Sequence, residues 1–412
     1  MSFMAKVIPM ILVMSFASAE ESEPCVVLSN YKQITLCAES RSPEVLRAES
    51  EVKQRKASVD AAGQLLNPEL SMQTISGSVQ SETKSETDVS LAFPIELGGK
   101  RSSRKSIATG ALSKAELELF NAKAEVRKSV LLKIVRLRQI DHELDLVDES
   151  AETFSKLVKQ YESRPTLSPE QEVTLTVFRV AKGEYGFKRM EYDEELAQLE
   201  SFFKIVIGKD LASVRKVLPP RISSMPLVPG ENKEVDKSPL LGLLDADIKI
   251  ANAERDRTFG DAWPTLNLGP SAKFSKEGSQ SFEQWGLNLS MPLPVLSLNQ
   301  GAKAAASAGV RSSEIRRETA LKELIARRTS LVEIYKKSAK ALEETPNGHT
   351  LESKHKKVET LFVKGLVPSS LVIEAHRSLV EFEKTRNNRE IKAVEAILEI
   401  QIIDGQEVEL SL

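Results

Sequence analysis

A change of periodicity that occurs twice places the strongest constraint on this fold. In Phe93–Arg104 and again in Met291–Ala302, a run of alternating polar and apolar residues gives way to a long helical pattern. A switch from a period of two to a period of 3.6 residues marks a strand that leads into a helix. Pro68 and Pro264, which precede the two alternating regions, are 196 residues apart. The chain is therefore predicted to contain two copies of one unit.

Each copy is predicted to run helix, strand, strand, long helix, helix. The first repeat covers residues 20–217, a Pro-rich linker follows at 218–237, and the second repeat covers 238–412. Strands are expected at about 69–79, 85–96, 265–275 and 282–293, with a polar turn at 81–87. Helices are expected at about 43–66, 100–163, 169–207, 239–262, 300–364 and 369–404, with a local break at Thr345–Gly348 and one helical turn at Thr35–Ser40.

The helical segments carry a heptad pattern. Two sets recur every seven residues in segment 100–163: Val130, Leu137, Leu144, Ala151 and Val158, and then Ile140, Val147, Phe154 and Tyr161. This repeat is typical of a coiled-coil seam, although any buried helix face gives a similar stripe. Ser168-Pro169-Glu170-Gln171 has the residues of a capping box, which predicts a new helix there. The first long helix measures roughly 95 Å, about the length of its two shorter neighbours placed end to end.

The strands separate polar from apolar side chains. The apolar face comprises Val89, Leu91, Phe93, Ile95, Leu266, Leu268, Ala272, Phe274, Trp285, Leu287, Leu289 and Met291. The polar face comprises Ser71, Gln73, Ser90, Asn267, Lys273, Asn288 and Ser290. Four strands leave two open edges, which strands of other chains must close if the apolar face meets lipid. The alternative is a sheet that packs on the helices of its own chain.

The N-terminus has the features of a signal peptide. Lys6 is followed by the short apolar run Val7–Phe16 and by Ala17-Ser18-Ala19, which fits a cleavage site near Ala19. A buried N-terminal helix is the alternative. Cys25 and Cys37 are the two cysteines, and an oxidising compartment would permit a disulfide between them as well as two free thiols. No apolar run of the sequence is long enough for a transmembrane helix.

The chemistry of the side chains points away from several classes of function. A formal net charge of −2 gives no basic excess to bind nucleic acid. We find no grouping of acid, base or nucleophile that predicts catalysis, and no cofactor motif. Gly98-Gly99-Lys100-Arg101 lacks the first glycine and the Ser/Thr of a phosphate-binding loop, so a tight strand-to-helix turn is predicted instead. The histidines lack zinc spacing and are expected to be solvated; they are His142, His349, His355 and His376.

Three motifs resemble the TolC-like outer-membrane efflux proteins. They are Phe93–Arg101 (FPIELGGKR), Pro292-Leu293-Pro294 with Asn299-Gln300-Gly301, and Gly365–Leu371 (GLVPSSL) with Glu374-Ala375 and Leu379. The resemblance covers nearly all of the predicted mature chain. The element Pro-Ile-Glu-Leu-Gly-Gly-Lys-Arg is most similar to the outer-membrane factor of cobalt–zinc–cadmium and copper (heavy-metal RND) efflux systems.

The resemblance implies a mainly α protein with a small β part. It implies a homotrimeric outer-membrane β-barrel, with four strands per chain, continued by a long periplasmic α-helical barrel. Such proteins are passive ducts that dock on an inner-membrane RND pump through a periplasmic adaptor, and divalent metal cations are the favoured cargo. The Gram-negative outer membrane, with a large periplasmic part, is then the expected location, and outer-membrane lipid is an expected partner.

The resemblance also assigns the adaptor contact to the two helical turns. These residues are Arg164, Pro165, Ser168, Gly365, Leu366, Val367, Pro368 and Ser369. The first turn lacks the glycine common in the family, and Glu374 stands where an Asp is often found. Nearby, Glu170, Glu172 and Glu374 are candidates for an acidic constriction in an assembled pore, with ordinary solvent-facing charges as the alternative.

Other functions remain open from the sequence alone. A periplasmic coiled-coil adaptor would share the long helices, but it would need one hairpin and a small β domain in place of two equal halves. An outer-membrane duct for drugs or for type I protein secretion would share the whole architecture. An extracytoplasmic enzyme is disfavoured because no catalytic grouping was found.

Overall fold

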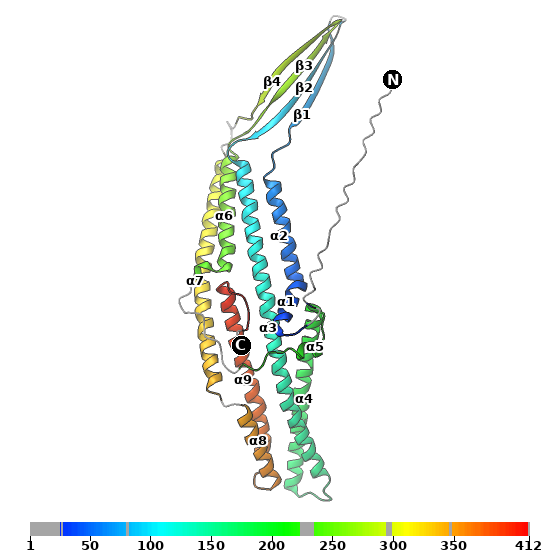
Figure 1. Ribbon diagram of the computed structural model, residues 1–412, viewed down its shortest axis with the longest axis vertical. Coiled ribbons are helices and arrows are strands. Elements are labelled where there is room, and N and C mark those ends of the chain that lie inside the picture. The colour runs from blue at the N-terminus through cyan, green and yellow to red at the C-terminus, as the bar shows by residue number, and fades with distance from the viewer. Residues whose placement is uncertain are drawn as a thin grey trace, which may run out of the picture.

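The computed structural model describes residues 25, 28–79, 82–222, 235–293, 299–345 and 348–410. The predicted signal peptide, residues 1–19, lies outside the described residues, as does most of the predicted linker (223–234). The molecule is elongated, with a sheet at one end of a long bundle of helices (Figure 1). The two long hairpins end in turns at the opposite end from the sheet.

Each half of the chain supplies helices and two strands. The helices of the first half are α1 (Tyr31–Arg41), α2 (Pro43–Ala62), α3 (Lys100–Glu162), α4 (Pro169–Val206) and α5 (Leu211–Arg215). Those of the second half are α6 (Pro239–Gly260), α7 (Gln300–Glu343), α8 (Gly348–Val363) and α9 (Ser369–Ile403), with a 3-10 turn, η1, at Val235–Lys237. The strands are β1 (Glu69–Val79), β2 (Glu82–Glu96), β3 (Thr265–Glu277) and β4 (Gln280–Ser290).

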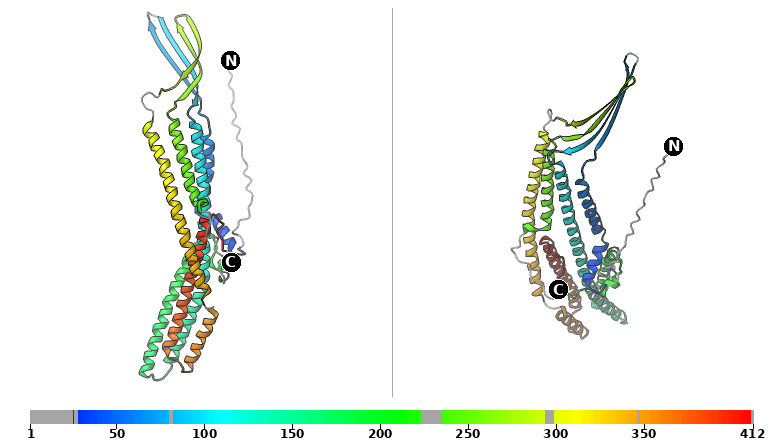
Figure 2. Two further views of the ribbon diagram at one scale, coloured as in Figure 1. Left: turned by 90° about the vertical axis from the view of Figure 1, so that its left-hand side faces the viewer. Right: turned by 45° about the horizontal axis from the view of Figure 1, so that its top comes forward.

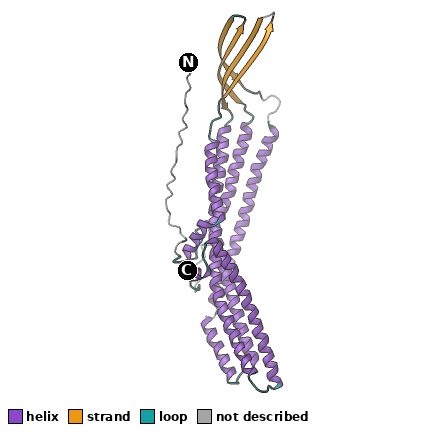
Figure 3. Cartoon of the chain, turned by 90° about the vertical axis from the view of Figure 1, so that its right-hand side faces the viewer, coloured by secondary structure: helices purple, strands orange, loops and turns teal. Residues whose placement is uncertain are grey.

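The long helix α3 is continuous over 63 residues. In Figure 1, α2 lies beside the upper part of α3 and α4 beside its lower part. Two shorter helices, one above the other, thus lie along one long helix. In the second half, α6 and α9 lie beside α7 and α3 (Figures 1 and 3). This is the arrangement that the matched helix lengths predict. Among the described residues, no helix combines the length and the apolar character that a membrane span requires.

Several boundaries differ from the sequence prediction. The predicted polar turn at 81–87 is wrong, because β2 begins at Glu82 and pairs with β1 from Glu82 to Ala92. Thr35–Ser40 lies within three turns of helix, α1. The predicted helix 300–364 is two helices, α7 and α8, and they are separated at the expected break. Residues 346 and 347, which lie between the two helices, are outside the described residues.

The strands form one antiparallel sheet in the order β1-β2-β3-β4. The two hairpins, far apart in sequence, meet where β2 pairs with β3, for example at Val89 and Ala272. The sheet is curved along its length (Figure 2). It extends beyond the ends of the helices, so the predicted alternative of a sheet covered by its own helices is wrong for this chain.

The core of the helical part lies between α3 and the helices beside it. The largest cluster joins α1, α3 and α4, and its buried members include Ile34, Ile140, Phe154, Phe178 and Phe203. A second cluster joins α3, α9 and the C-terminal segment (residues 404–410), which contributes Val408 and Leu410. The Phe154 ring lies 5.6 Å from the ring of Tyr185 and 6.0 Å from that of Phe178. Of these residues, Ile140 and Phe154 occupy heptad positions that the sequence pattern assigned to a seam.

Candidate functional site

The register of the sheet collects the predicted polar residues on one face. Ser71 pairs with Ser90, which pairs with Ser271. Asn267 pairs with Ser290. Because side chains alternate across a sheet, residues paired in this way lie on the same face. The full set of polar-face residues predicted from the sequence falls on this one face of the sheet: Ser71, Gln73, Ser90, Asn267, Lys273, Asn288 and Ser290.

The polar face carries a ladder of hydrogen bonds and ion pairs. The hydroxyls of Ser71 and Ser90 are 2.7 Å apart. Lys273 Nζ on β3 lies 2.8 Å from a carboxylate oxygen of Glu86 on β2, and Lys84 Nζ lies 3.8 Å from both Glu86 and Glu277. A hollow on this face is lined by polar side chains of all four strands, among them Gln73, Asp88, Ser271, Gln284 and Asn288. The face is therefore suited to contact with water and ions.

The opposite face of the sheet is apolar and exposed. Val89, Leu91, Phe93 and Ile95 lie on it together with residues of the neighbouring strands. The exposed fractions of Trp285 and Leu287 are 76% and 81%, and the Trp285 ring packs edge-on against Phe274 at 6.4 Å. Contiguous exposed apolar surface of this kind marks an interaction site. A sheet with one polar and one apolar face, each on strands of 11 to 15 residues, has the pattern of a membrane barrel wall.

A tight turn joins the sheet to α3. Gly98 and Gly99 have φ angles of +70° and +72°, which favour glycine over other residues. A Cβ at Gly98 would lie 2.6 Å from the carbonyl oxygen of Gly260, so α6 approaches this turn closely. Arg104 of α3 forms an ion pair with Glu96 at the end of β2. The predicted strand-to-helix turn is therefore confirmed, and the corresponding turn of the second half has Asn299 at φ +57°.

The first helical turn at the far end lies between α3 and α4. The predicted capping box is present: Gln171 N–H donates to Ser168 Oγ at 3.3 Å, and Ser168 N–H donates to Gln171 Oε1 at 3.1 Å. The guanidinium of Arg164 lies 4.4 Å from the centre of the Tyr161 ring. The cap fixes the start of α4, so the tip residues Arg164, Pro165 and Ser168 are held in one short connection.

The second helical turn lies between α8 and α9. Gly365 has a φ of +71°, and its N–H and that of Leu366 donate to the carbonyls of Phe362 and Leu361 at 2.8 and 2.9 Å. This is the bonding of a helix that ends in a left-handed glycine. The side chain of Leu366 is exposed, and Val367, Pro368 and Ser369 complete the turn.

The candidate acidic residues lie near both turns. Glu170 and Glu172 are in the first turn of α4, where negative charge favours the helix start. Glu374 belongs to α9 and accepts a hydrogen bond from Ser378 at 3.2 Å. All three are exposed, and within one chain they belong to two different hairpins. Within the described residues, His, Cys, Asp and Glu form no cluster of three or more that could hold a metal ion.

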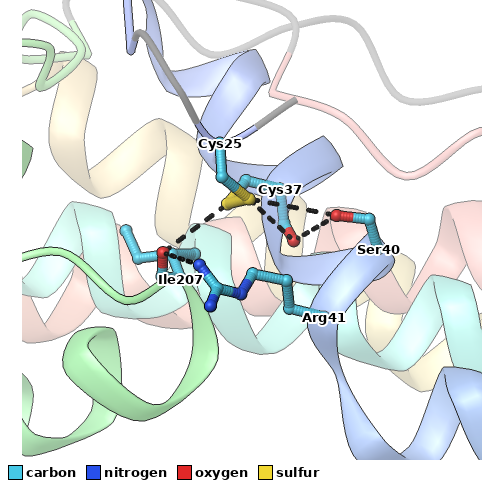
Figure 4. Close-up of a disulfide and its surroundings, with 5 residues drawn as sticks. All are labelled: Cys25, Cys37, Ser40, Arg41 and Ile207. Carbon is cyan, nitrogen blue, oxygen red and sulfur yellow. Dashed lines mark hydrogen bonds between the residues drawn. A yellow bond between two sulfur atoms is a disulfide. The ribbon is translucent and has the colours of Figure 1, made fainter. Parts of the chain in front are cut away.

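A disulfide staples the start of the described chain to α1. Cys25 and Cys37 are bonded, with their Cα atoms 5.0 Å apart, which decides between the two alternatives that the sequence left open. Figure 4 shows the bond beside the end of α4, where Arg41 Nη1 donates to the carbonyl of Ile207 at 3.3 Å. The bond thus ties the N-terminal segment to the middle of the helical bundle.

Polar side chains also occupy core positions that sequence reasoning missed. His376 is 1% exposed, so the prediction of a solvated histidine is wrong for this residue. Its Nδ1 lies 2.9 Å from Ser150 Oγ on α3, and its Nε2 lies 2.9 Å from Glu359 on α8. The only sequence signal was its helical spacing from the buried Val372 and Val380.

Burial lowers the pKa of Arg136, but the carboxylates of Glu195 and Glu143 outweigh burial and raise it above its usual value.

Comparisons with known proteins agree with this geometry. Residues 37–165 match the model of the outer membrane efflux protein family. The cobalt-zinc-cadmium resistance protein CzcC of Cupriavidus metallidurans is 23% identical over 261 residues, which is 62% of this chain and 60% of that protein. The matched region thus spans less than two thirds of that relative.

Solved structures share the fold over nearly the whole chain. The CmeC outer membrane channel of Campylobacter jejuni superimposes with a TM-score of 0.73 and 13% identity, covering 93% of this chain and 87% of that one. CusC, solved in a study of folding and transmembrane channel formation, gives a TM-score of 0.66 and 13% identity, covering 92% of both chains.

The chain shares the fold of these outer membrane channels, and its sheet has the polar and apolar faces of a barrel wall. Together with the match of residues 37–165 to the family model, they show that the chain is similar to the TolC-like outer membrane efflux proteins. The resemblance inferred from the sequence motifs is thereby confirmed.

Proposed function

We propose that three copies of this chain form an outer-membrane channel that acts as a passive duct for efflux. The observation that carries the proposal is the division of the four strands into a polar face with a hollow and an exposed apolar face. In a closed barrel the polar face lines a water-filled lumen and the apolar face contacts lipid. Closure requires other copies because four strands leave β1 and β4 with open edges.

The duct would belong to a tripartite RND-type system. In this proposal the helical bundle extends through the periplasm, and its two turns meet a periplasmic adaptor that connects to an inner-membrane RND pump. The exposed residues at the turns, Arg164 and Leu366 among them, are free to form such a contact in the single chain. We also infer an N-terminal signal peptide from the sequence pattern of residues 1–19, and an outer-membrane location from the similarity to outer membrane channels.

Divalent metal cations are the proposed cargo. The motif Phe93–Arg101, which resembles the heavy-metal branch, and the similarity to a cobalt-zinc-cadmium resistance protein both favour this choice. The polar face offers carboxylates such as Glu86 and Asp88. Among the described residues, however, no three His, Cys, Asp or Glu side chains lie close enough together to hold a metal ion. Cations would therefore pass in water rather than bind.

Two experiments test the proposal. The full chain purified in detergent is expected to have the mass of a trimer by light scattering and to give steady conductance in a planar bilayer. A monomer without conductance would overturn the channel function. Deletion of the gene is expected to lower growth on zinc, cobalt, cadmium or copper; unchanged metal tolerance with new sensitivity to drugs would overturn the cargo and favour a drug duct.

A further inference from the structure

Close to the sheet, α3 carries positive charge that the chain itself does not neutralise. Further along α3 the lysines are paired: Lys114 Nζ lies 2.8 Å from Asp247 of α6. In the same way, Lys123 Nζ lies 3.3 Å from Glu49 of α2. Lys105, which is nearer to the sheet, has no ion-pair or hydrogen-bond partner among the described residues. An uncompensated charge is therefore left near the point where the sheet meets the helices.

Two hollows beside this part of α3 bring further cations and hydroxyl groups together. The first, of about 580 Å³, is lined by Lys105 of α3 and Lys249 of α6. The second, of about 620 Å³, lies between α2 and α3 and is lined by Lys105 and Arg101. Asp60 supplies the one carboxylate among the described residues that line either hollow. The hydroxyl groups of the first hollow belong to Ser102, Ser106, Thr109 and Ser113.

We call Arg101, Lys105 and Lys249 the basic rim. All three residues are exposed. Arg101 Nε donates to the carbonyl of Gly63 at 2.7 Å, and Lys249, like Lys105, has no partner among the described residues. Lys249 lies about 16 Å from the sheet end of α6, and its long side chain can extend toward the sheet. The rim thus offers several free hydrogen-bond donors with positive charge.

The hollows open on the side of the molecule that carries the apolar face of the sheet. Glu96 lies on the polar face, because it follows Ser90 by an even number of residues in β2. Arg104 of α3 pairs with Glu96 and so points toward the polar side. At 100° per residue, Ser102 and Ser106 are each turned about 160° away from Arg104 on the helix. Because these two serines line the hollows, the hollows face away from the polar side.

The basic rim also lies at the height where lipid headgroups meet the protein. Phe93 and Ile95, the last residues of the apolar face on β2, are 48% and 44% exposed. Lys105 lies about 8 Å along α3 from the tight turn that follows them, and a headgroup layer is about 5–7 Å deep. Trp263 is 62% exposed and lies beside that turn, since a Cβ at Gly98 would be 3.0 Å from its Cβ. Exposed tryptophan is typical of a membrane–water interface.

We propose that the basic rim binds the phosphate group of an anionic phospholipid in the periplasmic leaflet of the outer membrane. The acyl chains of this lipid lie on the apolar face beside Ile95. The inference rests on the proposed function, which places the sheet in the membrane. Basic residues next to a membrane attract anionic lipids, and ammonium and guanidinium groups form strong hydrogen bonds with phosphate oxygens. The apolar face and the rim together fit both parts of one lipid molecule.

Quenching of tryptophan fluorescence by a brominated lipid tests the site. The chain has two tryptophans, so Trp285→Phe leaves Trp263, beside the rim, as the reporter. The full-length protein is reconstituted into phosphatidylcholine vesicles that contain a fixed fraction of brominated phosphatidylglycerol. Quenching is expected to exceed that by the same fraction of brominated phosphatidylcholine, because the anionic lipid is preferred by about fivefold for each cation that contacts its phosphate.

A double variant and a matched control locate the preference. Lys105→Gln with Lys249→Gln is expected to bring quenching by the two lipids close to equality. Because neither lysine has a partner among the described residues, this variant is expected to retain normal channel conductance. Lys159→Gln with Lys182→Gln removes the same charge from exposed positions nearer the helical turns, and the preference for the anionic lipid is expected to remain.

The possible outcomes separate the inference from the proposed function. Channels of normal conductance that are quenched equally by both lipids would overturn the inference and leave the proposed function intact. A preference that survives in the Lys105 and Lys249 variant would also overturn it. A higher unfolding midpoint with inorganic phosphate, without any preference for phosphatidylglycerol, would assign the rim to free phosphate instead. A protein that does not insert into vesicles would overturn both proposals.

Discussion

The side-chain amide of Asn387 on α9 donates a 2.7 Å hydrogen bond to the carboxylate of Glu143 on α3. Both residues are buried. Glu143 also accepts from Arg136 Nη1 at 3.1 Å, and Arg136 Nε donates to Glu195 of α4 at 2.7 Å. The two halves of the chain therefore meet in part through charges and amides, whereas α3 and α4 meet through an apolar seam with the Arg136–Glu195 ion pair beside it.

Replacing Glu143 tests how much this polar contact stabilises the bundle. Glu143→Leu removes the acceptor shared by Asn387 and Arg136 and leaves a buried amide and a partly compensated cation. Breaking a buried ion pair at one partner costs about 3–5 kcal/mol. We expect the free energy of unfolding, from denaturation followed by circular dichroism in detergent, to fall by about this amount.

An exposed ion pair provides the matched control. Glu152 and Lys156 are paired at 2.8 Å on α3, with side-chain exposed fractions of 67% and 72%. Glu152→Leu is expected to leave the free energy of unfolding nearly unchanged, since exposed ion pairs contribute little to stability. Equal losses for the two variants would contradict the role assigned to Glu143.

Much of the architecture could be predicted because it depends on periodicity. The duplicated switch from strand to helix gave the order of the elements, and the alternation within the strands gave both faces of the sheet. Ser168 and Gln171 predicted the start of α4, because a capping box is a local signal that needs no distant partner. The tight turn at Gly98 and Gly99 was predictable for the same reason.

The buried polar contacts could not be predicted from the sequence. His376, Glu383, Asn387 and Glu390 occupy buried positions of α9, but their residue types suggest a solvated face. Each of them has a partner on α3, more than 200 residues away, such as Arg138, which donates to Glu390 at 2.8 Å. A pattern within one helix carries no information about such partners. The start of β2 was missed because Lys84 and Glu86 are polar, although Lys84 pairs with Glu277 and Glu86 with Lys273 on the neighbouring strand β3.

The disulfide leads to a redox prediction. Cys25→Ser with Cys37→Ser removes a link between residues 12 apart, and closing a loop of this length stabilises a fold by about 3 kcal/mol. The loss should appear first as faster hydrogen exchange in α1 and the C-terminal segment, because Tyr31 Oη donates to Leu410 O at 3.1 Å. A reducing agent is expected to have the same effect on the unmodified protein and none on the double variant. Slow exchange in both forms would show that the disulfide is dispensable.

Gly98 and Gly99, in the tight turn between β2 and α3, differ in the space around them. Each has a positive φ, which costs an L-residue roughly 1–2 kcal/mol. A Cβ at Gly99 meets nothing within 4 Å, whereas a Cβ at Gly98 would lie 2.6 Å from Gly260 O. Gly99→Ala is thus expected to lower the unfolding midpoint slightly, and Gly98→Ala to lower it much more because α6 must move. Thermal unfolding of both variants in detergent measures the difference, and midpoints in the reverse order would contradict the close approach of α6.

Ionisation of Tyr185 predicts how stability changes at alkaline pH. Burial, reinforced by the charge of Glu184, raises the pKa of Tyr185 to about 12. An unfolded tyrosine ionises near pH 10, so the folded chain favours the neutral phenol. Its contribution to stability is complete below about pH 10 and is lost as the pH rises through about 12.

Tyr185→Phe keeps the ring that stacks on Phe154 at 5.6 Å and removes the group that ionises. The free energy of unfolding, measured from pH 8 upward for both proteins, is expected to fall less steeply above pH 10 in the variant. Burial also raises the pKa of Tyr335 to about 12, so some of the fall should remain. Because lysines titrate equally in both proteins, the difference between the two curves isolates Tyr185. Parallel curves through this range would show that Tyr185 ionises without penalty in the folded chain.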